Sequence, residues 1–66
     1  MNITVNGKQN SEFAGGSIHD LLGSLSINPK TVIVERNGEI VDRTTYSRTA
    51  LAESDIIEIV HFVGGG

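Results

Sequence analysis

The sequence of 66 residues predicts one α+β domain. In it a single helix packs across one face of a mixed sheet of about four to five strands. Three observations lead to this fold class. Asn-Gly dipeptides at residues 6–7 and 37–38 follow apolar runs and mark β-hairpins, because a type I′ turn needs two residues with positive φ. The segment between the hairpins has a helical apolar stripe. The last apolar run, residues 55–63, is rich in β-branched residues and fits a central strand.

The first hairpin begins with alternating apolar and polar residues, the period of a half-buried strand. Ile3 and Val5 are expected to face the core. The return strand, residues 8–13, is polar apart from Phe13. We therefore expect a weakly buried strand at the edge of the sheet.

The helix is predicted to begin after Ser17, with Asp20 at the capping-box position three residues later. Four apolar residues then follow at i, i+3, i+4 and i+7, which form one stripe: Ile18, Leu21, Leu22 and Leu25. Gly23 lies inside this stripe and costs about 1 kcal/mol relative to alanine. It indicates either a short helix or a close contact.

The second hairpin joins residues 31–36 to a short return strand at 39–41. Residues 42–50 are polar and irregular, with one helical turn expected near residues 43–46, while Tyr46 and Leu51 reach the edge of the core. The first and last strands are the most apolar, so we place them centrally and parallel to each other. This arrangement is the β-grasp, or ubiquitin-like, architecture.

The composition excludes several classes of function. The formal net charge is −3, and the five Lys and Arg residues are scattered, so a nucleic-acid partner is not expected. There is no cysteine, hence no disulfide framework and no thiolate metal site. No apolar run is long enough to span a bilayer, and the N-terminus does not resemble a signal peptide. We expect a cytoplasmic protein that does not bind membranes.

Three glycines close the chain and suggest a division into a β-grasp domain, residues 1–63, and a flexible glycine tail, residues 64–66. Gly64 and Gly65 lack side chains and could thread into a narrow partner active site. The chain ends in the carboxylate of Gly66. It is ionised at neutral pH and is a poor electrophile, so a partner must activate it. We find no catalytic residues, no metal ligands and no motif for ATP or another cofactor in this chain.

The last strand also predicts a docking surface. Because side chains alternate along a strand, Ile57 and Ile59 should face the helix, whereas the alternate residues should lie on the open face of the sheet. An exposed apolar patch on a small domain commonly marks an interaction site. The predicted docking surface consists of Ile33, Glu35, Glu58, Val60 and Phe62.

The chain resembles the ThiS family of bacterial sulfur-carrier proteins along nearly its whole length. The resemblance rests on the helix start at residues 17–22, the hairpin at 32–41 and the closing run 55–63 before the glycines. It implies that an E1-like adenylating enzyme uses ATP to join AMP to Gly66. Sulfur of cysteine origin, supplied by an enzyme such as a cysteine desulfurase, then gives a thiocarboxylate. Thiazole synthase would take this sulfur for the thiazole ring of thiamine. The chain itself would be a co-substrate and not an enzyme.

Three alternatives remain open at this point. A molybdopterin-type sulfur carrier uses the same terminal chemistry, but such chains tend to carry prolines before the glycines, and the single proline here is Pro29. A ubiquitin-like modifier would join Gly66 to target lysines. A plain β-grasp binding module would not need the glycines at all.

Overall fold

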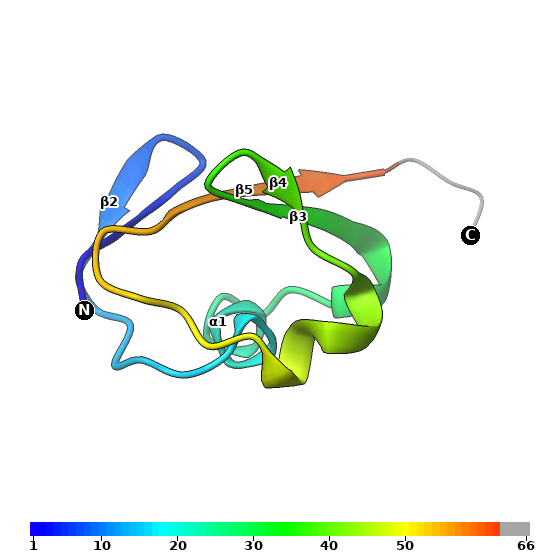
Figure 1. Cartoon of the computed structure of the whole chain (residues 1–66), viewed down its shortest axis with the longest axis horizontal. Coiled ribbons are helices and arrows are strands. Elements are labelled where there is room, and N and C mark those ends of the chain that lie inside the picture. The colour runs from blue at the N-terminus through cyan, green and yellow to red at the C-terminus, as the bar shows by residue number, and fades with distance from the viewer. Residues whose placement is uncertain (63–66) are drawn as a thin grey trace.

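The computed structural model describes residues 1–62, and Val63 to Gly66 lie outside this range. Five strands in the described part form one mixed sheet in the order β2-β1-β5-β3-β4 (Figure 1). One face of this sheet packs on the helix α1, and we call the opposite face the open face. The predicted β-grasp fold is thus confirmed. The elements are β1 Ile3–Val5, β2 Lys8–Asn10, α1 Ile18–Ser24, β3 Val32–Arg36, β4 Glu39–Ile40 and β5 Ile56–His61, with 3-10 helices η1 Pro29–Thr31 and η2 Arg43–Arg48.

Both predicted hairpin turns are present. Asn6 and Gly7 have φ values of 50° and 80°, and Asn37 and Gly38 have values of 52° and 86°. These positive angles are those of type I′ turns and explain why asparagine and glycine occupy the positions. The hairpins place β2 and β4 at the two edges of the sheet, and β5 lies parallel to β1 at its centre.

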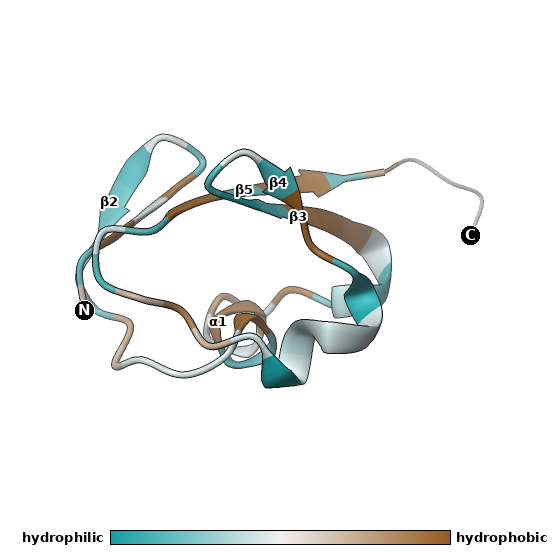
Figure 2. Cartoon of the chain, viewed as in Figure 1, coloured by the Kyte–Doolittle hydropathy of each residue, from teal (hydrophilic) through white to brown (hydrophobic). Residues whose placement is uncertain are grey.

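The strand β2 is shorter than the sequence predicted. The side-chain Oδ1 of Asn10 accepts hydrogen bonds from the backbone N–H groups of Glu12 (3.0 Å) and Phe13 (3.1 Å). An asparagine that bonds to the backbone just ahead of it forms a turn and ends the strand. Phe13 is nevertheless buried, as predicted. In Figure 2 the edge strand β2 is hydrophilic throughout, whereas hydrophobic stretches run along β5.

The predicted capping box begins α1. The backbone N–H of Asp20 donates to Ser17 Oγ (3.1 Å), and the N–H of Ser17 donates to Asp20 Oδ2 (2.9 Å). A Cβ on Gly16 would lie 2.5 Å from that same carboxylate oxygen, so glycine is required there. At Gly23 a Cβ would meet nothing within 4 Å, so the close contact considered for this residue is wrong. The helix is simply short.

The core lies between α1 and the sheet, and the segment of η2 closes it at one side. Tyr46 of η2 is buried, and its hydroxyl accepts a hydrogen bond from the backbone N–H of Val34 (3.2 Å). The expected single helical turn is thus a longer 3-10 helix, with Asp42 as its N-cap. The buried apolar residues are Ile3, Phe13, Ile18, Leu21, Leu22, Val32, Val34, Tyr46, Leu51, Ile57 and Ile59.

Across residues 1–62, every helix is too short or too polar to cross a bilayer.

Candidate functional site

The candidate site is built on β5, the central strand that leads to the C-terminal glycines. Its side chains alternate as predicted: Ile57 and Ile59 are 0% and 5% exposed, whereas Val60 is 50% exposed. Phe62, just after the strand, is 41% exposed. One face of β5 therefore anchors the strand in the core, and the other face is available to solvent.

A buried carboxylate fixes the start of β5. Asp55 accepts hydrogen bonds from Arg36 Nε (2.8 Å), Asn37 Nδ2 (3.0 Å) and the backbone N–H of Ala52 (2.9 Å). Burial tends to raise the pKa of Asp55, but these three donors outweigh it and hold the pKa below the ordinary value of an aspartate. The tip of the second hairpin is thereby tied to the residue before the strand.

A second polar contact fixes the middle of β5. The side chain of Asn6 accepts a hydrogen bond from the N–H of Ile59 (2.7 Å) and donates one to its carbonyl oxygen (3.2 Å). The backbone pairing of β1 with β5 ends at Ile57, whose carbonyl accepts from the N–H of Asn6 (2.9 Å). The amide side chain therefore continues the sheet where the backbone of β1 turns away.

The structure brings the predicted docking surface together on adjacent strands. Ile33 lies opposite Val60, and Glu35 lies opposite Glu58, in the antiparallel register of β3 and β5. Ile33 is 39% exposed, Glu35 is half-buried and Glu58 is exposed. These residues lie on one face of the sheet, and their role in docking stays a prediction.

Two exposed isoleucines on this face were missing from the prediction. Ile40 of β4 pairs with Glu35 and is 71% exposed, and Ile56 of β5 is 51% exposed. The alternation along β5 already placed Ile56 on the open face. Ile40 was harder to find, because a two-residue strand has no periodicity of its own.

Arg43 is a further residue that sequence patterns did not single out. Its guanidinium lies 5.6 Å from the centroid of the Phe62 ring, a cation–π distance. The same group donates to the carbonyl of Val32 (3.3 Å), and the N–H of Phe62 donates to the carbonyl of Thr31 (3.3 Å). These contacts hold the last described residue of the chain. Gly64, Gly65 and Gly66, the predicted threading and attachment residues, lie outside the described residues.

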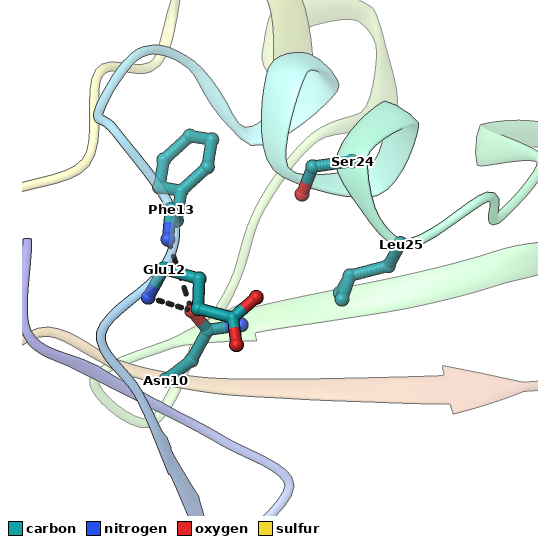
Figure 3. Close-up of a pocket in the computed structure, with 5 residues that line it drawn as sticks. All are labelled: Asn10, Glu12, Phe13, Ser24 and Leu25. Atoms are coloured by element: carbon teal, nitrogen blue, oxygen red, sulfur yellow. Dashed lines mark hydrogen bonds between the residues drawn. The ribbon is translucent and has the colours of Figure 1, made fainter.

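Two cavities lie among the described residues. One, of about 180 Å³, lies between the end of β2 and the end of α1, and is lined by Asn10, Glu12, Phe13, Ser24 and Leu25 (Figure 3). Asn10 already bonds to two backbone N–H groups, and the Ser24 hydroxyl donates to a carbonyl of its own helix. Another, of about 320 Å³, borders the open face at Thr4 and Ile56. Within residues 1–62, no group of three acidic, His or Cys side chains could hold a metal ion.

Comparison with known proteins places the chain in a family. The model of the ThiS family matches residues 3–66. The chain belongs to the ThiS family. The sulfur carrier protein ThiS of Bacillus subtilis is 55% identical over 51 residues, which are 77% of each chain. A thiazole synthase of Magnetococcus marinus is 46% identical over all 66 residues, but the chain spans only 20% of that protein's length.

A solved structure of this family has the same fold. The crystal structure of the thiamine biosynthesis protein ThiS from Geobacter metallireducens superposes with a TM-score of 0.84 at 35% identity, and the match covers all of both chains. The ThiS fold is thus found both in the described residues here and in that protein.

Proposed function

We propose that this chain is a sulfur carrier protein of thiamine biosynthesis. The observation that carries the proposal is the family match, which extends through the three closing glycines to residue 66. The Bacillus subtilis relative, named a sulfur carrier, supports it. In this role the chain is a co-substrate of its partner enzymes and not itself a catalyst.

The proposed chemistry takes place at Gly66. An E1-like adenylating enzyme transfers AMP from ATP to the Gly66 carboxylate and releases pyrophosphate, which turns a poor electrophile into an acyl adenylate. A sulfur-donor enzyme, such as a cysteine desulfurase, supplies sulfur as a persulfide, whose outer sulfur attacks the acyl adenylate and displaces AMP. A thiol then reduces the S–S bond of the resulting acyl disulfide, which leaves the thiocarboxylate. Gly64 and Gly65 give the carboxylate access to narrow active sites, because no Cβ widens the chain there.

Thiazole synthase is the proposed acceptor of the sulfur. Support comes from the relative in Magnetococcus marinus, which is named a thiazole synthase and contains a segment similar to this whole chain. Joining two interacting parts in one chain raises their effective concentration. Such a fusion is reasonable if the two parts work together.

The docking surface would position the domain while the glycines reach the active site. Val60, Phe62 and Ile33 supply exposed apolar area, and Glu35 and Glu58 supply negative charge. Apolar area contributes affinity, and the carboxylates affect association rate and salt dependence.

The test is coexpression with an adenylating enzyme and a sulfur donor, followed by mass spectrometry of the intact chain. A mass increase equal to replacement of one oxygen by sulfur, located at Gly66, is expected. The matched control is a chain that lacks Gly65 and Gly66. Absence of the increase at Gly66 when sulfur is plentiful would contradict the proposal, and isopeptide adducts to other proteins would favour a protein modifier instead.

A further inference from the structure

Two carboxylates face each other in the middle of the open face. Glu35 and Glu58 are direct partners in the register of β3 and β5. Like charges that lie opposite each other on adjacent strands destabilise a sheet. Within residues 1–62 the one salt bridge joins Arg36 to Asp55, so neither glutamate has a basic partner there. The arrangement lowers the stability of the isolated fold and leaves two carboxylates next to each other on the open face.

Exposed apolar side chains surround this pair. Ile33 and Val60 form the neighbouring cross-strand pair, Ile40 lies beside Glu35 on β4, and Ile56 lies two residues before Glu58 on β5. These four side chains are among the exposed large hydrophobic groups of the chain. A contiguous exposed apolar area is a feature of interaction surfaces. Because charged groups are usually depleted from the centre of an interface, two carboxylates at this position call for a basic partner group.

A second copy of the chain does not fit this surface. Two open faces that pack on each other would bring four carboxylates into one interface, and each chain carries a formal charge of −3. Juxtaposed like charges suppress an association. The favoured occupant is therefore a different protein with the opposite charge at its centre.

We propose that the open face recognises a partner protein that inserts one basic side chain between Glu35 and Glu58, inside a ring of apolar contacts with Ile33, Ile40, Ile56 and Val60. Arginine suits this position better than lysine, because its planar guanidinium can donate to two carboxylates at once. The choice of partner rests on the proposed function: it is the enzyme that activates the Gly66 carboxylate.

The experiment compares the unmodified chain with the double variant Glu35→Gln, Glu58→Gln. The dissociation constant for the adenylating enzyme is measured by calorimetry at low and at high salt. We expect the double variant to bind at least about tenfold more weakly at low salt and to lose most of its salt dependence. Its thermal stability should not fall, since the repulsion between the two carboxylates is removed.

Glu12→Gln is the matched control. It removes one negative charge, against two in the double variant, from an exposed residue that lines the cavity beside α1, away from the open face. The inference is overturned if the double variant binds as tightly as the unmodified chain, or if Glu12→Gln weakens binding equally. It is also overturned if the unmodified chain forms face-to-face dimers by ultracentrifugation.

Formation of the thiocarboxylate by the unmodified chain is measured in parallel. Its absence contradicts the proposed function. Its presence, together with unchanged binding of the double variant, contradicts only the docking inference.

Discussion

Asparagine side chains form hydrogen bonds to backbone groups of β5 where backbone pairing with the neighbouring strand does not reach. Asn6 pairs with both backbone groups of Ile59, and the Asn37 side chain accepts from the N–H of Ile56 (2.8 Å) while it donates to Asp55. Each asparagine also provides the positive φ of a hairpin turn. The Asn-Gly dipeptides predicted the turns because that signal is local. The bond from Asn6 to Ile59 joins residues 53 apart in sequence, and no local pattern contains it.

Asp55 is the residue at which stability should depend most clearly on pH. The pKa of this carboxyl is lowered, since its hydrogen bonds outweigh the opposing effect of burial. A lowered pKa in the folded state adds stability above the unfolded value of about 3.9, and that stability is lost as pH falls through the folded pKa. Asp55→Asn should therefore lower the free energy of unfolding at neutral pH by about 1.5–3 kcal/mol.

Urea unfolding at neutral pH and at a pH below about 3 checks this expectation. The difference in unfolding free energy between the unmodified chain and Asp55→Asn should be largest at neutral pH and should shrink in acid. Asp20→Asn is a useful control, because the pKa of Asp20 is also lowered, by its bonds to Ser17, but the residue is exposed. A difference for Asp55→Asn that stays constant with pH would contradict the assigned role.

At the scale of elements, the two short edge strands leave parts of the central strands without backbone partners. β4 ends at Ile40, and the hydroxyl of Tyr46 accepts the hydrogen bond of the Val34 N–H nearby. β1 ends at Val5, and Asn6 covers Ile59. The sequence predicted the order and pairing of the strands, because apolar content separates central strands from edges. It did not predict where each strand ends. Local bonds of the Asn10 side chain end β2, and long-range side-chain bonds are found where β1 and β4 end.

The hydrogen bonds of the Asn6 side chain can be removed without changing the turn geometry of its backbone. Asn6→Gly keeps the positive φ without strain but removes both bonds to Ile59. The expected loss of unfolding free energy is about 1–2 kcal/mol. Asn6→Ala should cost more, since it removes the same bonds and also strains the left-handed backbone.

Native-state hydrogen exchange measures the effect at the relevant amide. In Asn6→Gly the Ile59 N–H should exchange faster than the global loss of stability explains. The Val34 N–H, which bonds to Tyr46, is the internal control and should follow only the global change. Equal acceleration at both amides would mean that Asn6 stabilises the turn alone.

At the scale of the whole molecule, the fold and the proposed reactive group occupy separate parts of the chain. Within residues 1–62, every buried apolar residue of the core lies between Ile3 and Ile59. The predicted docking surface is made by residues of β3 and β5 and by Phe62, on the open face of the sheet. Its cross-strand pairs followed from strand order and alternation. Ile40 and Arg43 did not, because their place depends on how β4 and η2 fold back on the sheet.

This separation predicts the result of truncating the chain after Phe62. The shortened protein keeps the core residues found in the described part, the Asp55 network and the contact of Arg43 with the Phe62 ring. Its thermal midpoint should therefore stay within about 2 °C of the full chain, since a shift of about 4–8 °C corresponds to 1 kcal/mol in a domain of this size.

The shortened protein should still bind the adenylating enzyme through the open face, more weakly than the full chain, but form no thiocarboxylate. Calorimetry and mass spectrometry on the same samples separate these effects. A large drop in the thermal midpoint would mean that residues 63–66 contribute to the fold, and the division between an anchoring domain and a reactive segment would then be wrong.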